Sequence, residues 1–384
     1  MGKVLRDLRP VYVVGTGLHR YQHKSDTAYV ELGLTAVRAA LDDAGIDWPS
    51  VEAVYNGTAQ LGIAPTRIML RHLGTTGIPM TQVENASASG SSAFRQACLE
   101  VAGGVSDVVL AMGVDKPEGL RLASRKAGVA DLVGARAVPF THFALLANAY
   151  MHRYGIGPET IAAVAVKNHR NGANNPYAQR QQERSLAEVL AGPSISGSLT
   201  RLQCCPVGEG AAAVIVASAE AIERLGIDRA RAVRVVASTL RTERVYSGAA
   251  NFDAELTRET VAQGYDEAGI TPADLDVIEL HDAFSIEELL YVEAMGLCAE
   301  GGAAGLLESG GLDIGGRCAV SPSGGLLAMG HPIGPTGAGQ IVELTRQLRG
   351  EAGVRQQPNA RTGLAHMVGV GAVCAVHVLQ RDTA

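Results

Sequence analysis

The segment Ser321-Pro-Ser-Gly-Gly-Leu-Leu-Ala-Met-Gly-His331-Pro-Ile-Gly-Pro-Thr-Gly337 surrounds a single histidine with glycines and prolines. Glycine allows positive φ and close backbone approach, whereas proline fixes φ, so such a loop can hold an imidazole rigidly. The residues from Gly337 to Gly350 predict a helix, because they end on a basic turn followed by a glycine. His331 is therefore a candidate acid/base group at the start of a helix. A plain glycine-rich turn between two elements is the alternative interpretation.

The composition narrows the fold class and the kinds of partner. The 384 residues suffice for two ordinary domains or one large duplicated core. Hydrophobic residues make up 47% but aromatic residues only 4%, which favours a buried parallel sheet covered by helices. The net charge of −6, without a basic stripe, argues against a nucleic-acid partner. No apolar run approaches the roughly 20 residues of a membrane helix, and the charged N-terminus does not resemble a signal peptide.

The cysteines predict a cytoplasmic protein with free, mostly buried thiols. They form no CxxC pair, and the two adjacent ones are badly placed for a disulfide or a shared metal, so we expect no metal site. The six are Cys98, Cys204, Cys205, Cys298, Cys318 and Cys374.

The chain contains a weak internal repeat. Residues 43–55 and 267–279 each read as a helix ending at Ala-Gly, a proline-containing turn and then a strand. Residues 90–103 and 337–350 are glycine-bounded helices of equal length, and each leads into a β-rich segment. Because both pairs occur in the same order, they predict two similar βα-rich halves with two similar mixed sheets. Chance similarity of alanine-rich helices is the alternative.

A different kind of segment lies between the halves. Residues from about 116 to 205 are richer in Arg, Asn, His and Gln, which indicates an insertion of helices and loops, such as a lid or ligand-binding region. Its first part carries basic side chains that either contact phosphates or form a solvated face. These are Lys116, Arg121, Arg125 and Lys126.

Polar residues stand at several predicted strand-to-helix junctions. Ser87 precedes a predicted helix, where backbone N–H groups stabilise anions, although a serine there can also be a simple N-cap. His281 follows an apolar strand, where α/β sheets place ligand contacts, unless it is a satisfied core histidine. His331 is the third such position, and His366 in a glycine-rich last strand is a fourth.

Together these residues resemble the thiolase family, and most closely its sterol-carrier-protein type. Gly330-His331-Pro332 with Gly334 and Thr336-Gly337 resembles the family's GHPxGxTG loop. Further resemblances follow in the family's order and extend from about residue 10 to 380. His281-Asp-Ala-Phe284 resembles the HDCF loop, and Asn85–Gly90 resembles the nucleophile turn. Lys167–Pro176 resembles the loop-domain signature, and Glu209–Ala211 resembles the DGA motif.

The resemblance implies an α/β fold of two βαβαβαββ halves stacked as five αβαβα layers with an inserted loop domain. It places the halves at residues 8–230, with the loop domain at about 116–205, and at 234–384. It implies an acyltransferase of lipid metabolism that acts on acyl-CoA, has no permanent cofactor and forms a homodimer or homotetramer. It also implies coenzyme A-binding positions at Ser323, Gly324, Gly325 and Gly369.

In that chemistry a cysteine accepts the acyl group, a histidine activates it, a second cysteine moves the α-proton, and oxyanion holes stabilise the charged oxygens. The resemblance gives His331 the activating role, His281 the enolate oxygen, and His366 a proton-transfer role. This chain departs from the pattern at both cysteines, because it has Ser87 and Ala283. A hydroxyl is harder to ionise than a thiol and needs a true base.

Three functions remain open on these residues. The first is C-acyl transfer through Ser87, which is either an engineered replacement or a natural one. The second is a retro-aldol lyase acting on a β-hydroxyacyl-CoA with a zinc-ribbon/OB-fold partner, although such lyases usually alter the GHP loop that this chain keeps. The third is a catalytically reduced CoA-binding scaffold subunit of an acyltransferase complex.

Overall fold

The computed structural model describes residues 4–117, 138–246, 252–369 and 373–381. Its first half alternates strands and helices, as predicted. In chain order the elements are β1 (Val11–Gln22), α1 (Tyr29–Ala44), β2 (Ala53–Gly57), α2 (Pro65–Leu70), β3 (Met80–Val83), α3 (Ser89–Ala102), β4 (Val108–Asp115), β7 (Glu209–Ser218) and α7 (Ala219–Leu225).

The second half repeats this order. Its elements are β8 (Val233–Thr242), α8 (Phe252–Ala268), β9 (Val277–Glu279), α9 (Ser285–Ala294), α10 (Ala303–Glu308), β10 (Ala319–Val320), α11 (Gly325–Ala328), α12 (Thr336–Arg349), β11 (Thr362–Gly369) and β12 (Val373–Arg381). The predicted division into 8–230 and 234–384 falls just before β8 and stays a prediction.

The predicted internal repeat is confirmed by the way matching helices end. α1 and α8 each stop at an alanine followed by a glycine in the left-handed region, Gly45 with φ +68° and Gly269 with φ +71°. A glycine there caps the helix without the steric penalty of a Cβ. A short 3₁₀ turn and a strand follow in each case, Trp48–Ser50 before β2 and Pro272–Asp274 before β9.

The strands of both halves share one order, but they form one sheet instead of the two that we expected. The order is β10-β9-β11-β12-β8-β1-β7-β4-β2-β3. Within each half the first strand therefore lies at one edge, and β1 pairs antiparallel with β8 from Val11 to Val13 against Val233 to Val235. Each of these edges would otherwise leave backbone N–H and C=O groups unpaired, so joining them satisfies both.

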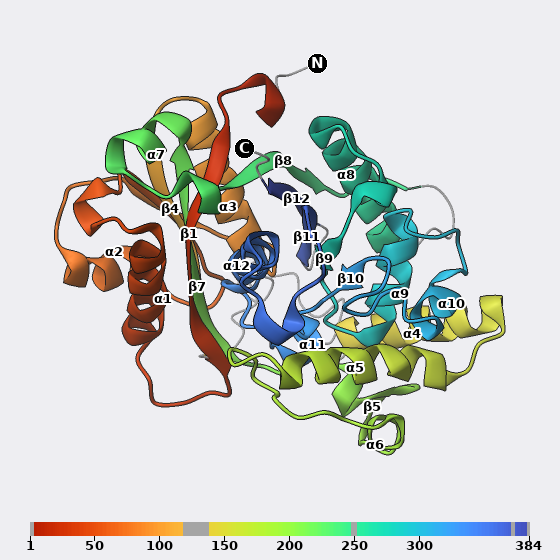
Figure 1. Cartoon of the computed structure of the whole chain (residues 1–384). Helices are drawn as coiled ribbons and strands as arrows, with labels where there is room; N and C mark the ends of the chain where they lie inside the picture. The colour runs from red at the N-terminus through yellow and green to blue at the C-terminus, as the bar shows by residue number, and fades with distance from the viewer. Residues whose placement is uncertain (1–3, 118–137, 247–251, 370–372, 382–384) are drawn as a thin grey trace.

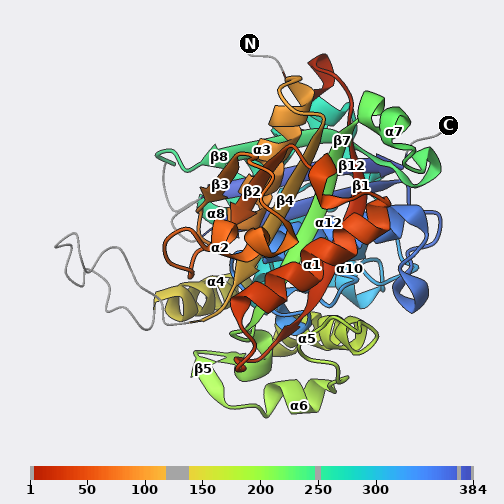
Figure 2. The ribbon, with the colours of Figure 1, turned by 90° about the vertical axis from the view of Figure 1, so that its left-hand side faces the viewer.

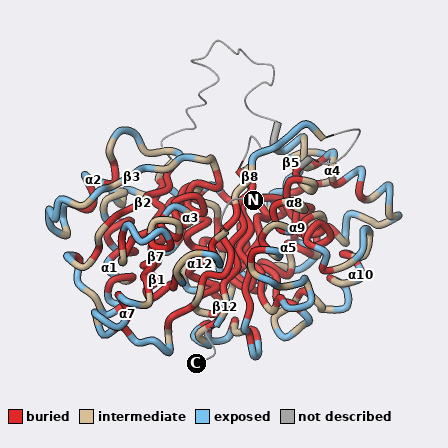
Figure 3. Tube along the Cα trace, turned by 90° about the horizontal axis from the view of Figure 1, so that it is seen from above, coloured by how far each residue is buried: buried red, intermediate tan, exposed pale blue. Residues whose placement is uncertain are grey.

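The predicted five layers are confirmed. α3 and α12 pack together between the two halves of the sheet, α1 covers the outer face of the first half, and α8 covers that of the second (Figure 1). Seen from above, buried residues fill the middle of the molecule and exposed ones follow its rim (Figure 3). The central helices approach closely because they are rich in small residues, and a Cβ on Gly90 would lie 2.5 Å from the Gly334 oxygen.

The inserted segment lies across one end of the layers, below the sheet in Figure 2. Its described elements are α4 (Val138–Tyr154), α5 (Pro158–Ala173), α6 (Leu186–Leu190), β5 (Ser194–Ser196) and β6 (Leu199–Thr200). α5 packs on α9 and α11, so the insertion is anchored to the second half.

The basic side chains predicted at the start of the insertion divide into two groups. Arg121, Arg125 and Lys126 lie outside the described residues. Lys116 is mostly buried and forms an ion pair with Glu209 at 2.9 Å, so it is neither a solvated charge nor open to a phosphate. In the described part of the chain, no helix is both long and apolar enough to cross a membrane.

Candidate active site

Three loops meet beside the central helices. Ser87 precedes α3, His331 precedes α12, and His281 follows β9. Ser87 Oγ lies 3.0 Å from His331 Nε2. The rings of His331 and His281 are nearly perpendicular, at 89°, with centroids 5.5 Å apart. The structure therefore brings together these three residues, which lie far apart in the sequence.

The turn that carries Ser87 has a constrained backbone. Ala86 has φ +49°, which is uncommon for a residue with a Cβ, and such strained residues cluster at functional sites. Gly369 packs against this turn, because a Cβ at position 369 would lie 2.5 Å from the Asn85 oxygen. Gly369 thus leaves room for the turn, and Ser87 is held just before the N-terminus of α3, where negative charge is stabilised.

The hydrogen bonds of Thr336 set the tautomer of His331. The Thr336 hydroxyl lies 2.5 Å from the Pro332 oxygen, which can only accept, so the threonine proton is donated there. Thr336 Oγ1 must then accept from His331 Nδ1, 2.9 Å away. The other nitrogen, Nε2, consequently presents a lone pair to the Ser87 hydroxyl. Burial and the neighbouring His281 lower the pKa of His331 to about 3, which keeps the imidazole neutral.

His281 is held by a buried carboxylate. Its Nδ1 donates to Glu287 Oε1 at 3.0 Å, and the second Glu287 oxygen accepts from the Phe284 N–H at 2.8 Å. The Tyr291 hydroxyl also donates to Glu287, at 3.1 Å. Within the described residues, the buried Nε2 of His281 has no hydrogen-bond partner. A buried polar atom without a partner is costly, so this nitrogen is suited to meet a ligand atom.

Two family models match the chain. The model "Thiolase, N-terminal domain" matches residues 11–186, and the model "Thiolase C-terminal domain-like" matches residues 238–381. Human "Sterol carrier protein 2" is 38% identical to this chain, across 96% of the chain and 71% of the human protein. The chain belongs to the thiolase family. The resemblance predicted from the sequence is thereby confirmed.

Two further proteins show how widely this thiolase resembles others. The "Benzoylsuccinyl-CoA thiolase subunit BbsB" of Thauera aromatica is 36% identical over 94% of this chain and 95% of that protein. The solved structure "Ltp2-ChsH2(DUF35) aldolase" superposes with a TM-score of 0.86 at 24% identity, with both chains fully covered. At that identity the similarity establishes a shared fold.

His366 lies apart from the other predicted site residues of this thiolase. It stands in the middle of β11, fully buried, with Nε2 3.0 Å from Thr257 Oγ1. Its ring packs edge-on against Tyr291 at 4.8 Å, and the Tyr291 hydroxyl donates to the same Glu287 carboxylate that accepts from His281. Burial lowers its pKa well below the ordinary value. The structure gives it no direct contact with Ser87 or His331, and its proton-transfer role stays a prediction.

The predicted coenzyme A positions at the start of the histidine loop are buried among protein atoms. Ser323 bonds to Glu279 through its N–H, at 3.0 Å, and through its hydroxyl, at 2.7 Å. Gly324 and Gly325 have φ of +105° and +59°, and a Cβ on Gly325 would lie 2.1 Å from Asp282 Oδ2. These contacts shape the loop that leads to His331. Coenzyme A binding at these positions, and at Gly369, stays a prediction.

The thiols of this thiolase are free, as predicted. Cys98, Cys204, Cys318 and Cys374 are buried, and Cys205 and Cys298 are partly so. Position 283 carries only the methyl group of alanine, and its carbonyl accepts a hydrogen bond from the backbone N–H of Cys205 at 2.8 Å. In the described part of the chain, no group of His, Cys, Asp and Glu side chains has the arrangement of a metal site.

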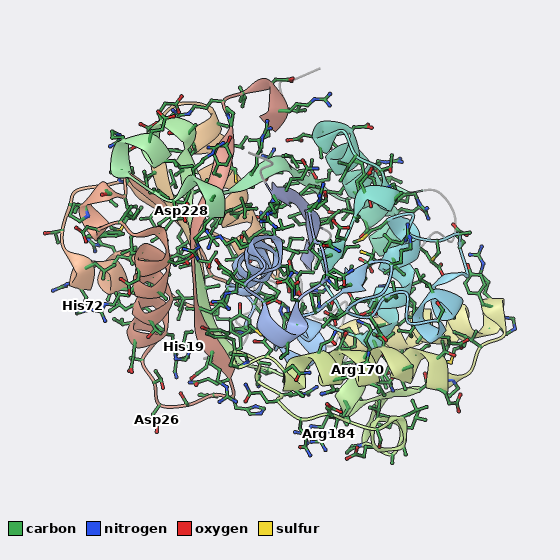
Figure 4. The ribbon with its side chains drawn as sticks, viewed as in Figure 1. His19, Asp26, His72, Arg170, Arg184 and Asp228 are labelled. Atoms are coloured by element: carbon green, nitrogen blue, oxygen red, sulfur yellow. The ribbon has the colours of Figure 1, made fainter. Side chains whose placement is uncertain are left out.

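A buried charged network ties the inserted segment to the His281 loop. Asn168 of α5 donates to Asp282 at 2.6 Å and to Glu288 at 3.2 Å, and Lys167 lies 3.2 Å from the Glu288 carboxylate. Burial and the neighbouring Glu288 raise the pKa of Asp282 well above its usual value. His72 lies at the outer edge of the first half, away from this network (Figure 4). The loop after β9 is therefore fixed by α5.

The sequence did not predict the residues that hold the two site histidines, Thr336 beside His331 and Glu287 beside His281. Thr336 was available within the GHPxGxTG pattern, five residues after His331, but its hydrogen bonds depend on where α12 begins. Glu287 follows His281 by six residues at the third position of α9, a place that favours an acidic cap and gave no sign of a bond back to the histidine.

Proposed function

We propose that this thiolase is an acyl-CoA C-acyltransferase in which Ser87 accepts the acyl group. The observation that carries the proposal is the 3.0 Å separation of Ser87 Oγ from an unprotonated His331 Nε2. The hydroxyl attacks the thioester carbonyl while its proton passes to Nε2. The coenzyme A thiolate leaves and takes that proton, and an ester on Ser87 remains. The α3 N-terminus favours the negative oxygen that develops beside it.

His281 serves the second substrate in this proposal. Its unpartnered Nε2 is placed to bind the enolate oxygen of the second thioester, while Glu287 holds the ring through Nδ1. His331, which is neutral again after the first step, is the base nearest to the reacting atoms. The finer expectations are a homodimer or homotetramer, a cytoplasmic location and, for the lyase alternative, a zinc-ribbon/OB-fold partner.

Intact-mass spectrometry tests the acyltransferase proposal. The protein is mixed with acetyl-CoA and with a longer acyl-CoA, and we expect a mass increase of one acyl group that peptide mapping assigns to Ser87. The Ser87→Ala protein should gain no mass. Ser309→Ala is a matched control, because Ser309 is exposed at the C-terminal end of α10 and its hydroxyl donates to the Leu306 oxygen. An adduct that persists in Ser87→Ala would disprove the role of Ser87.

Retro-aldol cleavage of a β-hydroxyacyl-CoA is a second candidate function. Both cysteine positions lack a thiol, whereas the rings of His281 and His331 remain in edge-to-face contact, with 5.5 Å between centroids. A base removes the β-hydroxyl proton, the carbon–carbon bond breaks, and His281 binds the resulting enolate oxygen before the α-carbon is protonated. Cleavage of such a substrate to a carbonyl product and a shorter acyl-CoA, undiminished in Ser87→Ala, would favour the lyase. Binding of acyl-CoA without any turnover would favour a catalytically reduced CoA-binding scaffold subunit.

A further inference from the structure

Ser87, His331 and Thr336 form a complete nucleophile, base and orienting group. Ser87 Oγ is 3.0 Å from His331 Nε2, and His331 Nδ1 is 2.9 Å from Thr336 Oγ1. An attacking hydroxyl, a neutral imidazole and a third group that fixes the imidazole tautomer are the parts that serine hydrolases use. Thr336 is itself anchored, because it donates to the Pro332 oxygen and is only 4% exposed.

Acylation of Ser87 changes what His331 faces. The hydroxyl proton has left with the coenzyme A thiol, so Nε2 again carries a lone pair, and the ester oxygen beside it has no proton to share. An incoming water can donate to that lone pair and attack the ester carbonyl. This second attack uses the same nitrogen and the same α3 N-terminus as the first, so it requires no further residue.

Carbon–carbon bond formation makes a greater demand on the site. The second thioester must lose a proton from its α-carbon, which requires a base on the side of that substrate. At position 283 the chain offers only a methyl group, and the buried His366 bonds to Thr257 and packs against Tyr291 instead of meeting Ser87 or His331. The replacement at 283 therefore slows the carbon route and leaves the water route intact.

We propose that this protein also hydrolyses acyl-CoA thioesters, through an acyl ester on Ser87. This inference rests on the acyl transfer to Ser87 in the proposed function. In the first half-reaction, acyl-CoA and the Ser87 hydroxyl give the ester and free coenzyme A thiol. In the second, the ester and water give the carboxylic acid and the Ser87 hydroxyl. The sum consumes one acyl-CoA and one water per turnover, and it needs no oxidant, reductant or metal.

The test follows acetyl-CoA and octanoyl-CoA without any acyl acceptor, in water enriched in oxygen-18. Released thiol is measured with a colorimetric thiol reagent, and the carboxylate is analysed by mass spectrometry. We expect many turnovers per protein, one oxygen-18 atom in each carboxylate, and loss of at least about 100-fold of the rate in Ser87→Ala, as for other activated nucleophiles. Ser309→Ala should retain the wild-type rate.

The possible failures are distinguishable. A stable ester on Ser87 with one equivalent of thiol and no carboxylate would overturn the hydrolase inference and leave acyl transfer to Ser87 standing. Absence of both adduct and thiol release would overturn both. Thiol release by Ser87→Ala at the wild-type rate would show that water attacks the thioester without Ser87, which also overturns the inference.

Discussion

Replacing Thr336 by valine tests whether the tautomer of His331 controls acylation. Valine keeps the shape of threonine and removes the hydroxyl that accepts from His331 Nδ1 at 2.9 Å and donates to the Pro332 oxygen. The imidazole can then move its proton to Nε2 and donate to Ser87 Oγ, which avoids a buried N–H without a partner. To react, it must return the proton to Nδ1, because only an unprotonated Nε2 can take the serine proton.

The magnitude follows from the cost of that return. A buried donor without a partner costs about 1–3 kcal/mol. Since every 1.36 kcal/mol in the barrier is a factor of ten, we expect Thr336→Val to slow acylation of Ser87 by about 5- to 150-fold. Thr336→Ser keeps the oxygen and should restore most of the rate. A general loss of structure would not be rescued in this way.

The assay is a single-turnover measurement of the acyl ester by rapid quench and intact mass, at several acyl-CoA concentrations. The rate at saturation should fall in Thr336→Val, whereas the concentration for half-saturation should stay within about threefold, since Thr336 has no direct contact with Ser87. Thr35→Val on the exposed face of α1 is a matched control, because its hydroxyl bonds only to the Glu31 oxygen. An unchanged acylation rate in Thr336→Val would falsify the tautomer argument.

Three other perturbations probe the same site. The rate of Ser87 acylation in the quench assay should be constant between pH 5 and pH 8, because burial lowers the pKa of His331 to about 3 and the base is neutral throughout this range. The rate should fall only as the pH approaches 3, and a titration near pH 6.5 would contradict the burial of His331. Gly369→Ala should reduce the rate of Ser87 acylation by about 100-fold, because the new Cβ would lie 2.5 Å from the Asn85 oxygen and displace the turn that carries Ser87. A normal rate would show that this turn adapts to the extra methyl group. Lys167→Met should lower the free energy of unfolding by about 3–5 kcal/mol, measured with urea, since it leaves the buried Glu288 carboxylate unpaired; a loss under about 1 kcal/mol would show that the carboxylate is already protonated.

Local signals in the sequence predicted the repeated halves of the fold. The two Ala-Gly helix ends specify their own backbone, because a left-handed glycine stops a helix wherever it occurs. The joining of the halves into one sheet could not be predicted in this way. The joining depends on the pairing of Val11 to Val13 with Val233 to Val235. The residues of either strand do not specify which strand, more than 200 residues away, they will pair with.

The site residues could be predicted from the sequence, but their roles could not. Ser87, His281 and His331 stood out because each lies at a junction between a predicted strand or loop and a helix. Their roles depend on distances that only the packing of α3 against α12 sets, such as the 3.0 Å between Ser87 Oγ and His331 Nε2. His366 illustrates the limit, since a histidine in a glycine-rich strand was predicted as a site residue, yet its contacts are with Thr257 and Tyr291.

The two missing thiols differ in what their replacements leave behind. Serine at position 87 keeps an attacking atom, and the lone pair of His331 Nε2 lies 3.0 Å from it, so the weaker acidity of a hydroxyl is offset by a base already in place. Alanine at position 283 keeps no group that can carry a proton. The site is therefore equipped to take an acyl group and to pass it to an acceptor that His331 can deprotonate. Water, an alcohol or a thiol can lose its proton directly to His331 Nε2. The α-carbon of a second thioester finds no second base at position 283 and must lose its less acidic proton to the same nitrogen, which makes carbon transfer the slower route.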